Sequence, residues 1–167
     1  DDAVGLVVKL NNSDLWDHAA PLKQELYARA EADPRIMIVD RKMSYADVVS
    51  LYASCDVFIS LHRAEGLGLI LMEMMSLGKP VVATAWSGNM DFMTEENSCL
   101  VGYEMVDIES SHVSYQEESS RTNAQWADPH VDEAADWMRR LADDAALRER
   151  LGELEGERHR GDREARG

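Results

Sequence analysis

The chain has 167 residues, of which 45% are hydrophobic and 29% are charged, and this length is enough for one domain with a buried core. Seventeen Lys and Arg against 32 Asp and Glu give a net charge of −15, so the chain as a whole repels nucleic-acid phosphates and anionic lipid headgroups. No apolar run approaches the roughly 18 residues that a membrane-spanning helix needs. The sequence opens on Asp1, with neither a start methionine nor a signal peptide, so we expect it to be a piece of a longer protein.

Cysteine and histidine usage argues against a disulfide framework and against a metal site. Cys55 and Cys99 each lie among apolar residues, which is typical of small core side chains. We therefore expect a reducing compartment and a cytoplasmic protein. The five histidines lack the regular spacing of metal ligands, so we expect no metal. They are His18, His62, His112, His130 and His159.

Five short apolar runs, rich in β-branched residues, alternate with segments of helical periodicity. This alternation predicts an α/β fold, a Rossmann-like parallel sheet flanked by helices. The runs lack polar alternation, as expected for strands that helices cover on both faces. The predicted strands are residues 5–10, 35–39, 56–60, 80–84 and 98–101.

Two helices are predicted before the third strand. The first covers 21–33, where apolar residues at helical spacing form one face. The second runs from 45 to about 54, because the Ser44 hydroxyl can cap its first turn and Asp47 suits the positive end of the helix dipole. The apolar face of the first helix comprises Leu22, Leu26, Tyr27 and Ala30.

Gly78 and Pro80 end a third predicted helix, because glycine tolerates the left-handed position after a helix and proline prevents its continuation. A short fourth helix and a longer fifth one follow the next strands. The three helices are residues 67–77, 89–95 and 131–151.

Two segments near the end of the chain lack clear periodicity. Residues 104–123 predict a long loop, followed at 126–129 by a turn with one buried aromatic. Residues 152–167 mix acidic residues with Arg and Gly and have almost no apolar anchor. We therefore expect one domain over 1–151 and a disordered, charged tail after it.

The segment from Ser60 to Glu73 contains the candidate site. It joins a predicted strand to a helix through a loop with Glu65, Gly66 and Gly68, at the carboxyl end of the strand, where ligands bind in open α/β sheets. The two glycines allow backbone N–H groups to approach a ligand, and the helix that follows directs its positive dipole end to the same point. An anionic group such as a diphosphate would be stabilised there. Taken alone, such a loop also occurs in purely structural settings, and two glutamates eight residues apart arise by chance in an acidic chain.

A wider pattern extends from Cys55 to Asn89. It contains a Glu, seven residues and a second Glu, then a Gly-x-Pro-Val-Val strand, then a Gly-containing turn. In this order the pattern resembles the C-terminal, nucleotide-sugar-binding domain of the retaining GT-B glycosyltransferases of group one, over about residues 33–101. The resemblance implies the Rossmann-like C-terminal half of a GT-B fold. It also implies transfer of a sugar from a nucleoside-diphosphate sugar to a glycan or polysaccharide, with retention at the anomeric carbon, as in bacterial polysaccharide biosynthesis.

The same resemblance implies a role for each residue of the loop, without a metal, a cofactor or an enzyme nucleophile. Glu65 would lie by the transferred sugar, contact its hydroxyls and be the catalytic residue. Glu73 would accept hydrogen bonds from the ribose hydroxyls, which suits an ionised carboxylate. Backbone N–H groups of Gly66-Leu67-Gly68 would bind the diphosphate or the sugar, and Leu69 would pack the loop beside the ribose. The turn Ser87-Gly88-Asn89 would flank the donor.

The cations of the family pattern are in doubt in this chain. In this resemblance, full-length relatives begin the domain with an extra strand and helix, whose Arg and Lys bind the diphosphate, and we expect this chain to start just after them. Lys9, at the end of the first predicted strand, would supply one charge, although a solvated strand-end lysine is the favoured interpretation. Arg63 is close to the loop and would supply a charge in the same way, but an ordinary surface arginine explains it at least equally well. His62 either orients a sugar hydroxyl or has a packing role.

Two other functions remain compatible with these residues. In the GT-B fold the acceptor binds between two Rossmann-like halves, so without an N-terminal domain this chain would bind a donor and be inactive alone. The full-length protein would then be cytoplasmic, peripheral to the inner membrane, and would need a glycan acceptor. An epimerase or phosphorylase of the same fold is one alternative, and a non-catalytic nucleotide-sugar-binding or scaffold module is the other.

Overall fold

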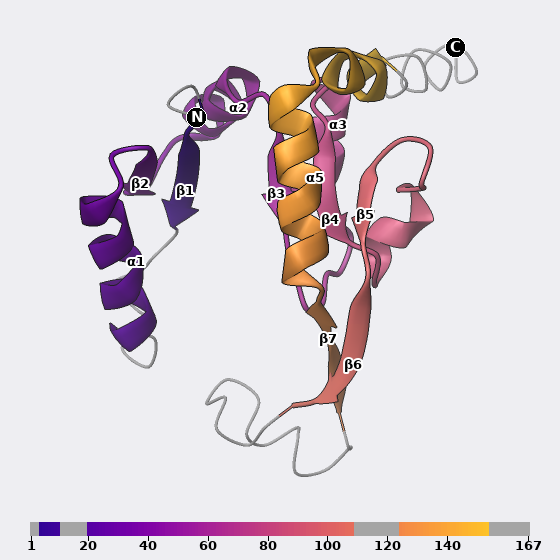
Figure 1. The fold of residues 1–167 in the computed structure, drawn as a ribbon, viewed down its shortest axis with the longest axis horizontal. Coiled ribbons are helices and arrows are strands. Elements are labelled where there is room, and N and C mark those ends of the chain that lie inside the picture. Colours follow the sequence, from indigo (N-terminus) through magenta and orange to yellow (C-terminus); the bar gives the residue numbers. More distant parts are fainter. Residues whose placement is uncertain (1–3, 11–19, 109–123, 154–167) are drawn as a thin grey trace. The chain divides into compact units, whose positions relative to one another are not determined.

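The protein is described here by a computed structural model, which covers residues 4–10, 20–108 and 124–153 (Figure 1). Helices and strands alternate through most of the chain, and the predicted α/β class with parallel sheets flanked by helices is confirmed. The chain divides into two compact units, Asp1–Val48 and Val49–Gly167.

The first unit consists of two strands and one helix, as the sequence predicts. β1 (Leu6–Leu10) and β2 (Ile36–Asp40) pair in parallel, with α1 (Ala20–Ala32) between them in the chain. The end of β2 is tied to α1 because Tyr27 donates a hydrogen bond of 2.8 Å to Asp40. The predicted apolar face of α1 is only partly right, since Leu22 is 68% exposed and α1 has no buried residue.

α2 (Tyr45–Ser54) begins where the sequence predicts, and Ser44 caps it. The Asp47 N–H donates to the Ser44 hydroxyl oxygen at 3.2 Å, while that hydroxyl donates to the Asp47 carboxylate at 2.7 Å. The reciprocal pair satisfies one of the N–H groups that the first turn of a helix leaves unpaired.

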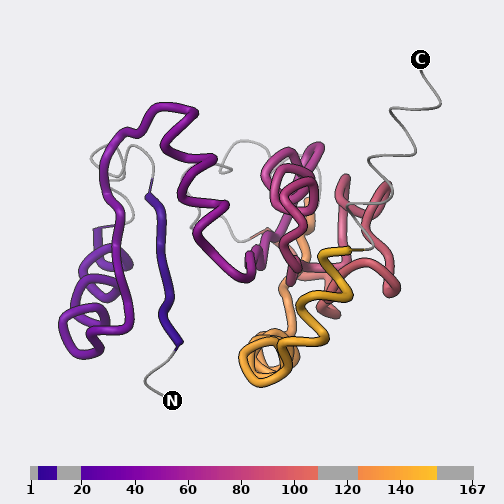
Figure 2. The backbone as a smooth tube through the Cα atoms, turned by 90° about the horizontal axis from the view of Figure 1, so that it is seen from above, coloured from indigo at the N-terminus to yellow at the C-terminus, as the bar shows by residue number. Residues whose placement is uncertain are grey.

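The second unit is built on a three-stranded parallel sheet in the order β3-β4-β5. Helices α3 and α5 cover its two faces, and Figure 2 shows them apart, with the strands between them. The three strands confirm the predicted positions. The bounds are β3 (Phe58–Ser60), β4 (Val81–Thr84), β5 (Cys99–Val101), α3 (Leu69–Ser76) and α5 (Val131–Asp143).

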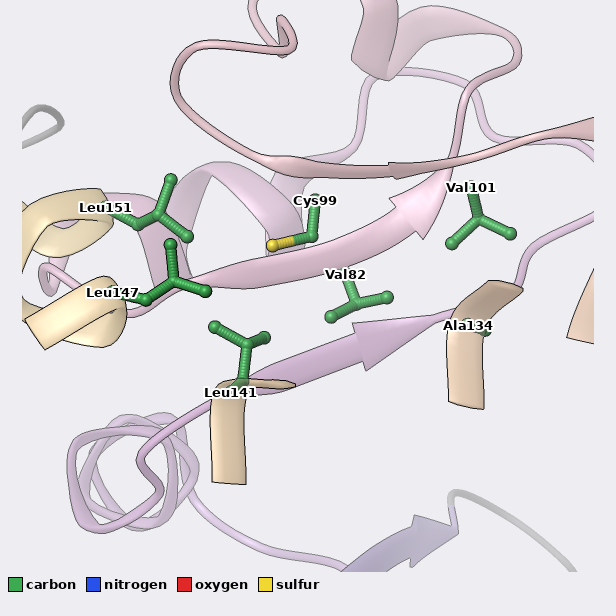
Figure 3. Close-up of a cluster of buried hydrophobic side chains, with 7 residues drawn as sticks. All are labelled: Val82, Cys99, Val101, Ala134, Leu141, Leu147 and Leu151. Atoms are coloured by element: carbon green, nitrogen blue, oxygen red, sulfur yellow. The ribbon is translucent and has the colours of Figure 1, made fainter. Parts of the chain in front are cut away.

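Alternating residues of the strands form two separate cores because successive side chains of a strand point to opposite faces. One core joins the sheet to α5 and the helix after it, as Figure 3 shows; its buried members are Val82, Cys99, Val101, Ala134, Leu141, Leu147 and Leu151. The other joins the sheet to α3; its buried members are Leu71, Met74, Met75, Val81, Ala83 and Met93. The prediction that Cys99 is a core side chain is confirmed.

Three predicted helix boundaries need correction. α3 begins at Leu69 rather than at residue 67, because Gly68 has left-handed backbone angles (φ 69°, ψ 36°) that a helix cannot contain. Instead of a helix over 89–95, one 3₁₀ turn, η3 (Gly88–Asp91), is present. The long final helix is interrupted at Asp144, whose carboxylate accepts a 2.9 Å hydrogen bond from the Leu147 N–H and so caps a second helix over 145–153.

The predicted loop at 104–123 and turn at 126–129 are wrong where the structure describes them. β6 (Tyr103–Asp107) and β7 (Gln125–Pro129) form an antiparallel pair, which extends from the end of the three-stranded sheet (Figure 1). Their mixed polar composition hides the strand pattern, because neither strand has a fully apolar face. Residues 109–123 lie outside the described part of the chain.

Gly78 ends α3 in the left-handed conformation (φ 68°), as predicted. Its N–H donates to the Met75 carbonyl, and the N–H of the next residue, Lys79, donates to the Met74 carbonyl. Gly152 lies against this turn so closely that a methyl group on it would overlap the Gly78 carbonyl oxygen. Residue 152 therefore belongs to the packed helix, whereas the rest of the predicted tail, 154–167, lies outside the described residues.

Candidate functional site

The loop between β3 and α3 holds Glu65 at the N-terminus of the helix. The Gly68 N–H donates a hydrogen bond of 3.1 Å to Oε1 of Glu65, whose side chain is half-buried. A carboxylate at this end is favoured by the positive end of the helix dipole. The first backbone hydrogen bond of α3 runs from Met72 to the Gly68 carbonyl, so the N–H groups of residues 69–71 have no partner within the helix. The Gly68 N–H is engaged by Glu65 and Leu71 is fully buried, so the exposed residues Leu69 and Ile70 carry the donors that the helix end presents.

A turn that follows β4 is hydrogen-bonded to the same glutamate from the other side. The Glu65 carbonyl oxygen accepts a bond of 2.6 Å from the Ser87 hydroxyl and one of 3.1 Å from the Gly88 N–H. The loop and the turn are therefore joined through one residue. The sequence predicts that both segments flank a donor, but it does not predict the bonds between them.

Gly66 and Gly88 meet face to face, yet they have different reasons to be glycine. A methyl group on Gly88 would overlap the Gly66 carbonyl oxygen, so the contact between loop and turn needs glycine at position 88. A methyl group on Gly66 would meet nothing within 4 Å. Neither packing nor a positive φ requires glycine at position 66, which leaves space beside the helix end.

His62 connects the end of β3 to the turn after β4. Its Nε2 lies 3.0 Å from the Trp86 carbonyl oxygen and 3.1 Å from Oδ1 of the buried Asn89. Since both neighbours are acceptors, Nε2 carries the proton, and Nδ1 accepts from the Ser60 hydroxyl at 3.2 Å. Both ring nitrogens thus have protein partners, and of the two roles left open by the sequence the geometry favours the structural one.

Arg63 is held by β7 instead of turning towards the glutamate. Its guanidinium forms an ion pair of 2.5 Å with Asp128 and lies 4.7 Å from the centre of the Trp126 ring. Its carbonyl accepts a hydrogen bond from the Ala127 N–H. The pair is exposed, so its contribution to stability is small, but it attaches the loop to the antiparallel strands.

Glu73 lies on α3, five residues after Gly68, which corresponds to about 7 Å along the helix axis. It is half-buried and shares a face of the helix with Leu69, four residues earlier. Leu69 is 61% exposed, so the expected packing of the loop by this side chain is wrong, and Leu67 is likewise 68% exposed.

Lys9 belongs to the first unit, where its ammonium donates a hydrogen bond to the carbonyl of the next residue, Leu10. Two residues at the end of β4 and in the turn after it, Thr84 and Ser87, have properties that the sequence does not predict. Ser87 has a positive φ of 81°, and Thr84, at the end of β4, is fully buried with a hydroxyl oxygen that has no hydrogen-bond partner. Backbone angles and burial of this kind depend on tertiary neighbours, so sequence spacing could not have indicated them.

The described residues contain no group of three or more His, Cys, Asp or Glu side chains placed to hold a metal ion. Among the helices of the same residues, none combines the length and the apolar character that crossing a membrane requires.

Three similarities to known proteins place this geometry in a family. The family model described as "Glycosyl transferases group 1" matches residues 16–110, more than half of the chain. A 52-residue stretch is 42% identical to the sulfoquinovosyl transferase SQD2 of Arabidopsis thaliana, covering 31% of this chain and 10% of that protein. The crystal structure of the C-terminal domain of a group 1 family glycosyl transferase (LpcC) from Francisella tularensis superposes with a TM-score of 0.57 at 22% identity, over 88% of this chain and 62% of that one.

The structural match shows the fold, which is that of the C-terminal domain of a GT-B glycosyltransferase. The chain spans about a tenth of the length of the curated relative that it matches. The family match includes both glutamates, the loop and the turn that holds Glu65. The chain therefore belongs to the group 1 glycosyltransferases.

Proposed function

We propose that this chain binds the nucleoside-diphosphate sugar that a glycosyltransferase uses as its donor, and that it does so at the N-terminus of α3. One observation carries the proposal: Glu65 is held at that helix end beside the open space at Gly66, in a chain of the group 1 family. The diphosphate would lie against the N–H groups of the exposed residues Leu69 and Ile70, where the helix dipole favours an anion.

The two carboxylates would bind different parts of the donor. Oε1 of Glu65 is engaged by the Gly68 N–H, which leaves the other oxygen of the carboxylate to accept hydrogen bonds from hydroxyls of the transferred sugar. Glu73, about 7 Å further along the helix, would accept from the ribose hydroxyls. Gly88 would flank the donor from the adjacent turn.

The net charge of −15 makes these short-range donors important. The summed charge of the chain opposes an anionic ligand, but physiological salt screens exposed charges beyond about 8 Å. Backbone N–H groups in direct contact with the diphosphate are screened much less. Binding should therefore depend on the helix end more than on distant cations.

The reaction that we propose is hexosyl transfer with retention of anomeric configuration. The bond between the anomeric carbon and the diphosphate breaks, and the diphosphate keeps the electron pair. The acceptor oxygen attacks the same face of the sugar and passes its proton to the departing diphosphate. The protein contributes positioning and stabilisation of the departing charge, so no enzyme nucleophile and no metal or other cofactor is required.

The acceptor in this proposal is a glycan or polysaccharide precursor of bacterial type, bound between this domain and an N-terminal domain. Without that second domain the chain would bind the donor and not turn it over. We further propose a cytoplasmic location, peripheral to the inner membrane in the full-length protein. The name of the curated relative indicates a sulfoquinovosyl transferase, but the matched stretch is too short to extend its sugar to this chain.

The decisive experiment is a titration of the 167-residue chain with UDP, GDP and ADP and their common sugar conjugates, followed by calorimetry and amide NMR. One nucleotide should bind selectively and shift the amides of the loop. Glu73→Ala should weaken the binding of that nucleotide by about ten- to a hundredfold, because hydrogen bonds to a charged acceptor each contribute about 1.5–3 kcal/mol.

The matched control is Glu95→Ala, which removes one exposed carboxylate from the same unit at a distance in sequence from the loop. It should leave the affinity unchanged within about twofold. Equal affinities of the two variants would refute the role of Glu73. Failure of every nucleotide to bind would refute donor binding by this chain and favour the scaffold alternative.

A further inference from the structure

Ser87 has a backbone conformation that an L-residue rarely adopts. Its angles are φ 81° and ψ −153°, and among the described residues it is the only one with a positive φ that is not glycine. This region of backbone angles is occupied almost only by glycine, and other residues persist there when the surrounding structure holds them. A serine at this position therefore needs a compensating interaction.

The turn around Ser87 is held at both ends by side chains. His62 donates to the Trp86 carbonyl at 3.0 Å, and the amide nitrogen of the buried Asn89 donates to the Thr84 carbonyl at 3.0 Å. Between these ends, the Gly88 N–H donates to the Glu65 carbonyl at 3.1 Å. A glycine at position 87 would retain all of these bonds without strain.

The hydroxyl is what serine adds at this position. It donates to the Glu65 carbonyl at 2.6 Å. Glu65 is thereby fixed from two sides, by the turn at its carbonyl and by α3 at its carboxylate, where the Gly68 N–H donates at 3.1 Å. The carbonyl and the carboxylate belong to the same residue, Glu65. A shift of its main-chain carbonyl therefore also moves its carboxylate.

We propose that Ser87 is a positioning residue, whose hydroxyl holds Glu65 in the orientation that meets the transferred sugar. This inference rests on the proposed function of Glu65 as the sugar-contacting residue. It assigns the strained serine to discrimination between a nucleoside-diphosphate sugar and the nucleoside diphosphate alone. The hydroxyl itself does not contact the ligand in this proposal.

The test compares Ser87→Ala and Ser87→Gly with the native chain. The first variant removes the hydroxyl and keeps a side chain at the strained position, and the second removes both hydroxyl and strain. Both should bind the sugar conjugate of the preferred nucleotide about five- to tenfold more weakly, which corresponds to about 1–1.4 kcal/mol and matches the loss of one neutral hydrogen bond. Both should bind the free nucleoside diphosphate within twofold of the native chain. If the role of Ser87 were purely structural, its replacement would weaken the binding of both ligands together or of neither.

Ser98→Ala is the matched control, because the Ser98 hydroxyl also donates at 2.6 Å to a main-chain carbonyl, that of Thr94, in the same unit. It should leave the ratio of the two affinities unchanged. A second check is the pair Ser87→Ala and Glu65→Gln: in the Glu65→Gln background, removal of the Ser87 hydroxyl should have no further effect on sugar binding. Independent, multiplying effects would overturn the proposal.

The NMR signal of the Gly68 amide separates this inference from the proposed function. That amide donates to the Glu65 carboxylate, so its proton shift reports the position of Glu65 without any ligand. Ser87→Ala and Ser87→Gly should move it, whereas Ser98→Ala should not. If the native chain binds no nucleotide, the proposed function fails while this readout still decides whether Ser87 positions Glu65. An unmoved Gly68 amide in both Ser87 variants would refute the positioning role.

Discussion

Replacement of Gly88 by alanine should destabilise the second unit strongly, because two main-chain segments meet at this residue. A methyl group there would overlap the Gly66 carbonyl oxygen. Both colliding groups are attached to the backbone, so no side-chain rotation can relieve the overlap, and the turn must move away from the loop. That movement breaks the two hydrogen bonds that the Glu65 carbonyl accepts from Ser87 and Gly88.

The expected magnitude follows from those contacts. Each of the two hydrogen bonds contributes about 0.5–1.5 kcal/mol net, and the carbonyl of the half-buried Glu65 left without a partner adds a desolvation cost of about 1 kcal/mol. We therefore expect Gly88→Ala to lower the free energy of unfolding by about 2–4 kcal/mol. With a urea dependence of about 1–3 kcal/mol per molar, the unfolding midpoint should fall by about 0.7–4 M.

Gly66→Ala provides the opposite result at the facing residue. A methyl group there meets nothing within 4 Å, so the free energy of unfolding should change by less than about 0.5 kcal/mol. Nucleotide affinity should fall instead, because the added methyl occupies the space proposed for the donor.

Urea unfolding followed by tryptophan fluorescence is the appropriate assay, since three of the four tryptophans lie in the second unit. They are Trp86, Trp126 and Trp137. Equal midpoints for Gly88→Ala and the native chain would refute the argument from contact. A large loss of stability in Gly66→Ala would refute the claim that its surroundings are open.

The other predictions concern strain and ionisation. Gly68→Val places a β-branched residue at φ 69°, so the free energy of unfolding should fall by about 2 kcal/mol or more, and an unchanged urea midpoint would contradict the strain. Burial raises the pKa of Cys99 to about 11, so iodoacetamide at pH 8 should modify the half-buried Cys55 well before Cys99 when the folded chain is analysed by mass spectrometry; equal rates would argue against burial. Hydrogen bonds from Arg35 lower the pKa of Asp33 from 3.8 to about 2, so the folded state binds this proton less readily than the unfolded state. The resulting stabilisation is present above about pH 4 and is lost as the pH falls towards 2, and Asp33→Asn should make circular-dichroism unfolding curves less dependent on pH across that interval.

Much of the fold could be predicted because its signals are local. Apolar runs mark all five strands of the parallel sheets. Ser44 caps α2 through a hydrogen bond from the N–H of Asp47, three residues later, and Gly78 followed by Pro80 ends α3. Each of these signals depends on neighbours within a few residues. The antiparallel pair β6-β7 was missed because its stability comes from pairing between segments about twenty residues apart, such as Val106 with Trp126.

The candidate site divides in the same way. Local sequence predicts a glutamate in a glycine-containing loop before a helix, and Glu65 lies at the N-terminus of α3. Apart from Ser60, the side-chain partners of His62 and Arg63 are 24 to 65 residues away in the chain, so sequence left their roles open. The expected packing of Leu69 failed because the loop is held by hydrogen bonds instead of by that side chain.

By itself, the sequence determined the alternation of strands and helices, the family pattern of two glutamates, and the loop in which the first of them lies. Only the tertiary structure decided why Gly88 must be glycine, why Ser87 tolerates a strained backbone, and which N–H groups the end of α3 presents. The physical reason is range. Helix caps and strand patterns arise from residues that are neighbours in the chain, whereas the contact of the Glu65 loop with the turn after β4 exists only once β3 and β4 lie side by side.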